Sequence, residues 1–559
     1  MRCSLAVSLL ILPAVVFAEV PPDAGALRQQ IEQNQQPSLP HKAMPAKPAE
    51  PLAMQPQKGV IVTVKSFRFA GNTLLTARQL EPAVKSYLNH PLDFNQLQAA
   101  ATAVANAYRE AGWIVRAYLP KQDIVEGVVT IQIVEAVFGR VHLQGLPPTR
   151  VKLGTVMPFF EAQQKTGDLF NTDALDRALL IADDLPGVAI SGSLGEGAHE
   201  RETDLIVKMA DEPLVVGEAA LDDTGSRSTG AARLTANLNL NSPLKIGDLF
   251  STNYIHTQGS DYLRLGETLP VGSNGWRVGI NASNLDYKLV APEFSALNGK
   301  GTSGTVGLEA SYPLIRSRLK NLYFNANLDR KSFDNQASGT TTTHYKAATF
   351  SLALNGNLFD NIGGGGANSA SLSLVDGILN LDGSPNQAAD ASTANTAGHY
   401  AKLHYAATRQ QVITEDLAFF GSLSGQLSNR NLDSSEKFYL GGSGGVRAYP
   451  SSEGGGSEGE LINLELRRKL PQGFNLTGFY DYGHVTVNHN NSFSGATALN
   501  ECSLKGAGLS LAWQNGNGPS LKATWARRIG SNPNPTANGN DQDGSLLKNR
   551  FWLVASQQF

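Results

Sequence analysis

One short segment of the chain matches the spacing of a hydrolase nucleophile. Gly441-Gly442-Ser443-Gly444-Gly445 fits the pattern G-x-S-x-G. That pattern presents a reactive serine only on a strained turn that joins a strand to a helix. Here the flanking residues are rich in glycine, and no helical pattern follows. We therefore interpret Ser443 as a loop residue and predict no catalytic residue in this segment.

Other residues that could hold a metal or a cofactor are scattered. Cys502 is the single cysteine beyond Cys3, so no cysteine cluster and no intrachain disulfide can form. The sequence has no phosphate-binding loop and no dinucleotide fingerprint. Two histidine pairs lack a carboxylate at the spacing of a metal site: His399 with His404, and His484 with His489. We expect no metal site, no cofactor and no enzymatic activity.

A charged pair is a better candidate for function. Arg447 lies in the glycine-rich segment 438–460, within Val446-Arg447-Ala448-Tyr449-Pro450. In segment 474–483, Tyr480 and Tyr482 alternate with Asp481, so a lipid-facing tyrosine side would aim Asp481 at a lumen. A loop arginine and a lumen carboxylate can form a charge-assisted pair. From spacing alone, a solvated Arg447 at the surface is an equal alternative.

The segment that must position this pair has the pattern of a membrane β-barrel. Apolar and polar residues alternate from 214 to 559, in runs of about ten residues, the length of a tilted membrane strand. The polar positions are mostly Asn, Ser and Thr, which suits a wet lumen and argues against a soluble sandwich. At roughly 20 residues per strand and loop, about 16 antiparallel strands fit, with no helix. Phe559 ends the last strand.

Composition agrees with this fold class. Charged residues make up 17% of the chain, below the roughly 25% of soluble proteins. The chain has 56 glycines and a mean hydropathy of −0.20, too polar for a bundle of membrane helices. Its formal net charge of −3 gives no indication of nucleic-acid binding.

The N-terminal residues predict three short segments. Residues 1–18 have the charge, the apolar run and the small-residue cleavage pattern of a signal peptide. Residues 19–36 are expected to contain a polar amphipathic helix over 22–36, with Leu27 and Ile31 on its apolar side. Such a short helix must dock elsewhere in the protein or stay mobile. Residues 37–58 hold six prolines and predict an extended linker.

An internal repeat separates the linker from the barrel. Two units, 59–138 and 139–213, each have the order strand–helix–helix–strand–strand. In the first unit we expect strand 61–69, helices 76–88 and 93–111, and strands 113–119 and 128–138. In the second we expect strand 140–145, helices 152–165 and 171–185, and strands 188–194 and 203–210.

These features together resemble the two-partner secretion transporters, the haemolysin-activator and filamentous-haemagglutinin transporter family. The repeat resembles two polypeptide-transport-associated (POTRA) domains. Four motifs carry the likeness: Tyr108-Arg109-Glu110-Ala111-Gly112-Trp113, Leu221-Asp222-Asp223-Thr224-Gly225, Val446-Arg447-Ala448-Tyr449 and Phe479-Tyr480-Asp481-Tyr482-Gly483. At position 448 this chain has alanine where the family's motif has glycine. If this position needs a positive φ, alanine would strain it, so the backbone conformation of the loop is in question.

The resemblance implies a 16-stranded barrel in the bacterial outer membrane, with the N-terminal region in the periplasm. It implies an inward-folded loop held by Arg447, Tyr449, Asp481 and Gly483, and a plug helix that carries Leu27 and Ile31. It also implies that a large secreted exoprotein, such as an adhesin, a haemolysin or a toxin, is recognised unfolded and exported through the pore. The other expected partners are outer-membrane lipid and the barrel-assembly machinery that inserts the barrel. We expect no nucleic-acid partner.

Two alternatives remain open at this point. A barrel-assembly or insertion factor of the same superfamily would usually carry more periplasmic domains and would lack the plug helix and the proline-rich linker. A general diffusion porin would have no need of residues 19–213.

Overall fold

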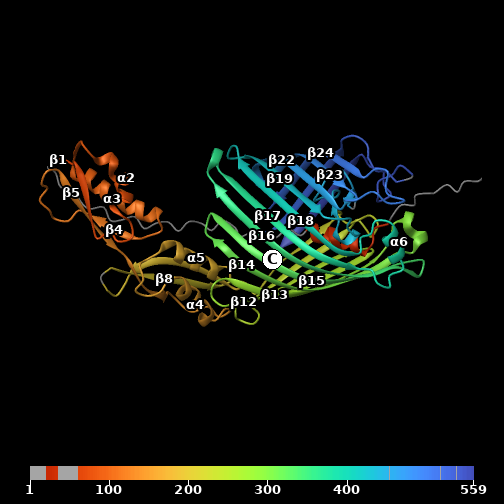
Figure 1. The fold of residues 1–559 in the computed structure, drawn as a ribbon, viewed down its shortest axis with the longest axis horizontal. Helices are drawn as coiled ribbons and strands as arrows, with labels where there is room; N and C mark the ends of the chain where they lie inside the picture. The colour runs from red at the N-terminus through yellow and green to blue at the C-terminus, as the bar shows by residue number, and fades with distance from the viewer. Residues whose placement is uncertain (1–20, 35–60, 200, 452, 517, 537) are drawn as a thin grey trace, which may run out of the picture.

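The computed structural model describes residues 21–34, 61–199, 201–451, 453–516, 518–536 and 538–559. Two small α/β units precede a large barrel, and the three bodies follow one another along the longest axis of the molecule (Figure 1). The predicted signal peptide 1–18 and the predicted linker 37–58 lie outside the described residues. Within the described residues, no helix has the length and apolar character needed to cross a membrane.

The barrel is closed and antiparallel, as the alternating pattern predicts. Its sheet runs without interruption from β9 to β26, and β26 pairs with β9 to close it. Its strands, in order around the barrel, are β9 (Val215–Asp222), β10 (Arg233–Asn241), β11 (Leu249–Thr257), β12 (Ser260–Val271), β13 (Trp276–Lys288), β14 (Lys300–Arg316), β15 (Lys320–Ala337), β16 (Thr340–Asp360), β17 (Gly366–Asn380), β18 (Gly398–Val412), β19 (Leu417–Ser428), β22 (Glu458–Lys469), β23 (Phe474–Thr486), β24 (Glu501–Gln514), β25 (Pro519–Arg528) and β26 (Asn549–Gln558).

Alternation along each strand separates lipid-facing from lumen-facing residues. On β15, Phe324 and Leu328 point outward, whereas Asn321 and Asn335 point inward and are buried. The outward residues form an apolar band, and the inward ones form hydrogen bonds across the wall, such as Asn321 to Asn357 at 3.1 Å. This division is the one that a membrane barrel with a polar interior requires.

The two preceding units share one topology. In the first, the sheet order is β2-β5-β4, with β2 parallel to β5. In the second it is β6-β8-β7, with β6 parallel to β8. The first unit contains β1 (Val62–Thr63), β2 (Ser66–Ala70), α2 (Ala77–Val84), η1 (Lys85–Tyr87), β3 (Pro91–Leu92), α3 (Phe94–Glu110), β4 (Val115–Tyr118) and β5 (Val128–Glu135). The second contains β6 (Val137–Leu143), α4 (Leu153–Gln163), α5 (Thr172–Asp183), β7 (Val188–Glu196) and β8 (Glu202–Asp211).

Three sequence-based expectations about elements were wrong. The expected strand 128–138 contains the end of one strand and the start of the next, because β5 ends at Glu135 and β6 begins at Val137, so the expected boundary between residues 138 and 139 falls inside β6. The expected strand 61–69 is two strands, because the chain turns at Val64 and Lys65: β1 pairs with β3, while β2 joins the main sheet. The expected absence of helix beyond 214 fails at α6 (Gln387–Ser392). There Asp390 accepts hydrogen bonds from the backbone of Thr396 and Ala397 and stabilises a helical loop, which strand alternation cannot reveal.

Charged contacts anchor the second unit to one turn of the barrel. Asp184, which follows α5, accepts two hydrogen bonds from Arg316 at 2.7 and 2.8 Å. Asp176 on α5 lies 2.7 Å from Arg318. Residues 317–319 connect β14 to β15, so this turn lies at the end of the barrel next to the second unit. The longer loops lie at the opposite end.

Candidate functional site: two segments inside the barrel lumen

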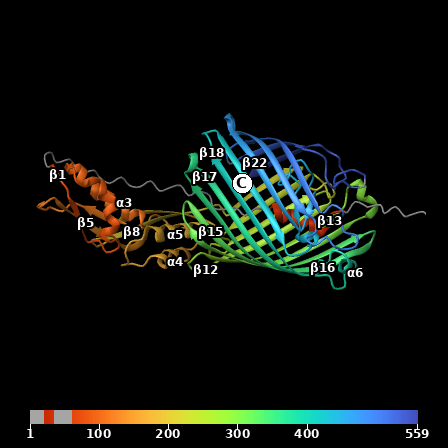
Figure 2. The same cartoon turned by 45° about the horizontal axis from the view of Figure 1, so that its top comes forward.

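Helix α1 (Ala24–Asn34) lies inside the barrel, against β13, β14, β15 and η4 (Ser434–Glu436). Figure 2 shows it in red, enclosed by the strands. Asp23 starts the helix by accepting a hydrogen bond from the Ala26 N–H at 2.8 Å. An isolated helix of this length is marginal in water, so the barrel wall must supply its stability.

Each predicted apolar residue of the helix faces the wall. Leu27 is 6% exposed and belongs to an aromatic-rich cluster, and Ile31 packs against the same cluster. The barrel residues of the cluster include Tyr262, Tyr287, Phe333, Tyr345 and Tyr400. Leu27 and Ile31 therefore seat the helix through apolar burial in an otherwise polar lumen.

The polar side of the helix carries one internal ion pair. The Arg28 guanidinium lies 2.7 Å from Glu32, one turn further along. Arg28 is 2% exposed, and it also donates to the hydroxyls of Ser283 and Ser303 at 3.1 and 3.2 Å. These bonds satisfy a buried guanidinium that would otherwise be costly to bury.

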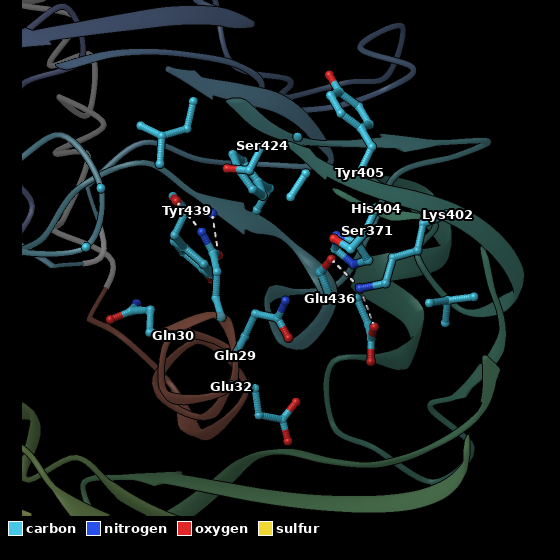
Figure 3. A pocket seen from close by; sticks show the side chains of 18 of the residues that line it. Gln29, Gln30, Glu32, Ser371, Lys402, His404, Tyr405, Ser424, Glu436 and Tyr439 are labelled. Carbon is cyan, nitrogen blue, oxygen red and sulfur yellow. Dashed lines mark hydrogen bonds and ion pairs between the residues drawn. The ribbon is translucent and has the colours of Figure 1, made fainter. Parts of the chain in front are cut away.

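A second charged cluster links the barrel wall to η4. Glu436 lies 2.9 Å from Lys331 on β15 and 2.7 Å from Lys402 on β18. Lys331 is also 4.0 Å from Glu32 of the helix. Figure 3 shows Lys402, Glu436 and Glu32 around one cavity of about 520 Å³. Its remaining lining is mostly hydroxyl and amide groups, including Thr349, Ser351, Ser371, Thr408 and Ser424.

The helix and the inward loop contact each other directly. The loop contains β20 (Phe438–Tyr439) and β21 (Gly455–Gly456), which pair with each other. The Gln33 amide donates to the Tyr439 carbonyl at 2.8 Å and accepts from the Tyr439 N–H at 3.2 Å. The Ser434 hydroxyl donates to Asp23 at 2.8 Å. Movement of either segment would therefore break hydrogen bonds to the other.

Arg447 and Asp481 are brought together inside the barrel. Nη2 and Nε of Arg447 donate to the Asp481 carboxylate at 2.6 and 2.9 Å, and the Arg447 N–H donates at 3.0 Å. Asp481 is fully buried, and Asn463 on β22 donates to it at 2.8 Å. The guanidinium lies 3.5 Å from the centre of the Phe479 ring. This geometry removes the alternative of a solvated arginine.

Sequence reasoning did not find the second carboxylate. Glu465 on β22 accepts from Arg447 Nη1 at 2.8 Å and lies 2.7 Å from Arg467. A signal was available, because Glu465 is a charged residue at a lumen-facing position of an alternating strand. The same signal marks Lys331 and Lys402. Arg28 and Glu32 were visible as an i,i+4 pair.

The remaining predicted loop residues pack closely around Arg447. A side chain at Gly483 would approach Leu440 to 2.8 Å and Val446 to 3.1 Å, so glycine leaves room for the loop. Tyr449 is 1% exposed, and the Arg528 guanidinium lies 4.2 Å from its ring centre. Ala448 does not adopt a positive φ, so alanine is accommodated at this position without strain.

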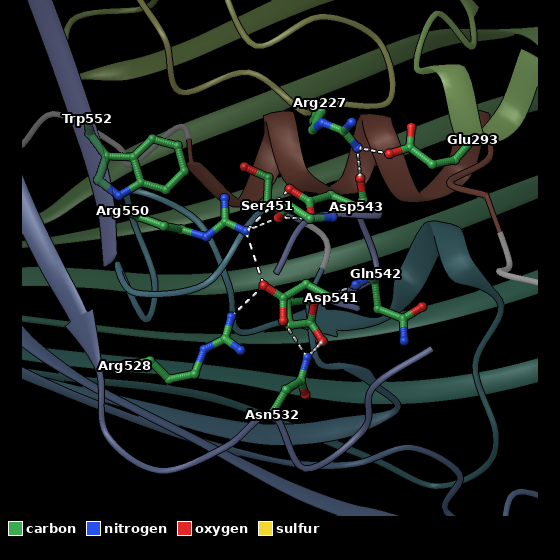
Figure 4. Close-up of polar contacts among 12 residues, drawn as sticks. Arg227, Glu293, Ser451, Arg528, Asn532, Asp541, Gln542, Asp543, Arg550 and Trp552 are labelled. Atoms are coloured by element: carbon green, nitrogen blue, oxygen red, sulfur yellow. Dashed lines mark hydrogen bonds and ion pairs between the residues drawn. The ribbon is translucent and has the colours of Figure 1, made fainter. Parts of the chain in front are cut away.

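A third segment, between β25 and β26, contacts the inward loop beside this site, and Figure 4 shows its polar contacts. Asp541 accepts hydrogen bonds from Arg528 at 2.5 Å, from Asn532 at 2.8 Å and from Arg550 at 3.2 Å. Asn532 also donates to Glu453 of the inward loop at 2.8 Å. Trp552 donates to the Arg447 carbonyl at 2.8 Å. The site thus connects the inward loop to the strands that close the barrel.

The weaker candidates do not assemble into a site. Ser443 lies in the loop between β20 and β21, and no helix follows it among the described residues of that loop. Cys502 is buried and free. Among the residues that the structure describes, no three His, Cys, Asp or Glu side chains gather as a metal site.

In the first of the two small units, one carboxylate joins the helices to the sheet. Glu135, at the end of β5, accepts from the backbone of Thr73 and Leu74 at 2.7 and 2.8 Å and from the Tyr108 hydroxyl at 3.2 Å. Burial raises the pKa of Glu135, but the hydrogen bonds from Thr73, Leu74 and Tyr108 outweigh it, so its pKa lies below the ordinary value. Burial and the neighbouring Glu135 raise the pKa of Tyr108 to about 12.

Comparison with known sequences places the chain in a family. The model described as "Haemolysin secretion/activation protein ShlB/FhaC/HecB" matches residues 201–512, and "POTRA domain, ShlB-type" matches residues 62–136. The heme/hemopexin transporter protein HuxB of Haemophilus influenzae is 26% identical over 99% of this chain and 98% of that protein. The outer membrane transporter CdiB of Dickeya dadantii is 24% identical over 79% of each chain.

Solved structures show the same fold. CdiB from Escherichia coli aligns with a TM-score of 0.68 at 20% identity, covering 91% of this chain and 94% of that one. BamA from Haemophilus ducreyi lacking POTRA domains 1-3 aligns with a TM-score of 0.52 at 14% identity, covering 89% of this chain. The family model covers more than half of the chain. The chain therefore belongs to the ShlB/FhaC/HecB family of haemolysin secretion and activation proteins, outer-membrane β-barrel transporters with periplasmic POTRA domains.

Proposed function

We propose that this transporter binds a large secreted exoprotein in unfolded form in the periplasm and exports it through the barrel. The polar lumen supports this proposal most directly. An unfolded backbone crossing the membrane needs hydrogen-bond partners along its path. The hydroxyl and amide groups around the cavity beside α1, such as Ser371, Thr408 and Ser424, can provide them.

The two periplasmic units supply recognition in this proposal. Each three-stranded sheet ends in edge strands, β2 and β4 in the first unit and β6 and β7 in the second. An extended segment of an unfolded partner can add to such an edge by backbone hydrogen bonds, without a folded epitope. The partner is then an extended polypeptide, such as the N-terminal part of an adhesin, a haemolysin or a toxin.

Two inward segments hold the pore closed at rest in this scheme. Arg447, Tyr449, Asp481 and Gly483 form what we call the loop lock, and α1 forms the plug through Leu27 and Ile31. The support is that both segments lie in the lumen and bind each other at Tyr439. Opening the pore requires the plug to leave, whereas the loop lock keeps the inward loop folded against β23.

The experiment that tests the function uses the partner gene product expressed with and without this chain. Export of the partner should depend on the full chain and should stop when residues 61–213 are deleted from a barrel that still inserts. Purified residues 61–213 should bind an N-terminal fragment of the partner saturably, at tens of micromolar or tighter. Export that persists without residues 61–213 would contradict periplasmic recognition by these units.

The second candidate, a barrel-assembly factor, has less support. The structural likeness to BamA covers the barrel fold at 14% identity and carries no activity. In addition, α1 fills the lumen of this barrel, and insertion of client proteins into the membrane gives no reason for a seated plug.

A further inference from the structure

A groove on the outer wall of the barrel combines apolar walls with two basic residues. The groove has a volume of about 770 Å³, within the range of about 300–1,000 Å³ typical of ligand sites. It crosses strands β12 to β17, which lie side by side on one wall (Figure 1). Small residues, namely Ala282, Gly304, Ser332 and Ala348, alternate there with the larger residues Leu263, Leu265, Val306 and Ile378.

The groove lies at the outer edge of the apolar band. The periplasmic turn 317–319 fixes the direction of β15, whose outward side chains then run in the order Leu322, Phe324, Ala326, Leu328, Arg330 and Ser332. On β16 the band ends in the same way, with Ala348 followed by Lys346 toward the outer loop. Arg330 pairs in register with Ala348, and Lys346 pairs with Ser332, so the two cations are diagonal neighbours on one face.

Both cations are exposed and available. Among the described residues, the side chains of Arg330 and Lys346 have no hydrogen bond or ion pair with another side chain. The carboxylates near the groove on this outward face already have partners. Asp334 lies 3.2 Å from His344, Asp376 lies 3.8 Å from His399 and Asp261 lies 2.8 Å from His256, while Asp286 accepts a hydrogen bond from Asn284 at 2.5 Å. An unpaired Arg–Lys pair above an apolar groove is complementary to a ligand with a phosphate head and acyl chains.

We propose that this groove binds a phosphorylated glycolipid of the outer leaflet, of the lipid A type. Its acyl chains lie between Leu263, Val306 and Ile378, and a phosphate is held by Arg330 and Lys346. Asn284 and Asn380, which also line the groove, face the sugar hydroxyls. The outer leaflet is the source because the two cations end the apolar band on the side opposite the periplasmic units.

The test measures lipid binding to the full-length transporter in detergent by native mass spectrometry. Bisphosphorylated lipid A is titrated against the wild type and the double variant Arg330→Gln/Lys346→Gln. Each basic residue near a charged lipid surface adds to the free energy of lipid binding. Loss of both residues should therefore weaken lipid A binding about 30-fold. The matched control is Lys505→Gln/Arg527→Gln, which removes an outward Lys–Arg pair from β24 and β25 on another part of the wall. The control should stay within about threefold of the wild type.

A second variant separates the groove from the charges. Gly304→Leu/Ala348→Leu fills the floor and leaves both cations in place, and it should also weaken lipid A binding. Heat-modifiable migration on gels checks that each barrel is folded. Three results would overturn the proposal. The control variant could lose as much lipid A binding as the groove variants, either groove variant could bind lipid A as well as the wild type does, or the wild type could bind phosphatidylglycerol as tightly as lipid A. The last result would assign the groove to anionic phospholipid in general.

Discussion

At the scale of single residues, Asp481 depends on Arg447 for its charge balance. Removing the arginine leaves a buried carboxylate with Asn463 and one backbone N–H, a loss of about 3–5 kcal/mol if the site stays dry and less if water enters. We expect Arg447→Ala and Asp481→Ala each to abolish or strongly reduce partner export while the barrel still inserts. Export is measured at matched barrel levels in the outer membrane.

The control for this prediction is Arg467→Ala. Arg467 shares Glu465 with Arg447 but does not touch Asp481, so its loss should leave most export intact. Exchanging the charges at positions 447 and 481 should not restore export, because the new carboxylate would face Glu465. If Arg447→Ala exports as well as Arg467→Ala does, the loop lock has no part in transport.

Glu135 gives a residue-scale prediction about pH. Its folded pKa is lowered, so its contribution to stability is full above the ordinary value of 4.5 and is lost as the pH falls through the folded pKa. In residues 61–213 expressed alone, Glu135→Gln should lower the free energy of unfolding by about 1–3 kcal/mol at neutral pH. The difference should shrink below pH 4.5.

Urea unfolding at several pH values measures this difference. Glu81→Gln, an exposed change on α2, is the control and should have little effect at any of them. A Glu135→Gln difference that stays constant with pH would show that the carboxylate acts through packing alone.

At the scale of elements, α1 is the removable part of the lumen. Its removal would join the space it fills to the adjacent cavity of about 520 Å³. We therefore expect deletion of residues 19–36 to raise single-channel conductance in a planar bilayer. Leu27→Asp, which places a charge in the aromatic cluster, should raise the frequency of openings without changing the conductance of the open state. Unchanged conductance after the deletion would exclude α1 as the plug.

The elements also show what the sequence can and cannot predict. Alternation is a local property, so the lumen-facing position of Asp481 followed from its neighbours Tyr480 and Tyr482. The partner of Asp481 came from a family resemblance, because spacing alone left Arg447 undecided. The contact of Asn532 with Glu453 joins segments 79 residues apart through an irregular loop, and no local pattern encodes such a contact. No local pattern encodes the position of α1 in the lumen either, because its contacts with the barrel join residues more than 250 positions apart in the sequence.

At the scale of the whole molecule, two arginines fix the second periplasmic unit beneath the barrel. Arg316 ends β14 and pairs with Asp184, which directly follows α5, and Arg318 in the next turn pairs with Asp176 within α5. We expect Arg316→Ala/Arg318→Ala to broaden the distance distribution between spin labels at Leu146→Cys and Glu415→Cys in a Cys502→Ser background. Arg140→Ala, which removes a contact inside the unit, is the control and should leave the distribution narrow. Equal widths in all three proteins would show that other contacts hold the unit.

The pairing of Arg28 with Glu32 has an electrical consequence. These are the two charged residues within Ala24–Asn34, and their charges cancel. The pair therefore adds no net charge to the plug, and an applied voltage does no net work on the pair when the helix leaves the lumen. Glu32→Gln would leave the charge of Arg28 uncompensated and change the moving charge by one unit, worth about 2.3 kcal/mol per 100 mV if it crossed the full field. The voltage dependence of openings in a planar bilayer should therefore differ between Glu32→Gln and the wild type, whereas Arg28→Gln/Glu32→Gln should keep the wild-type voltage dependence.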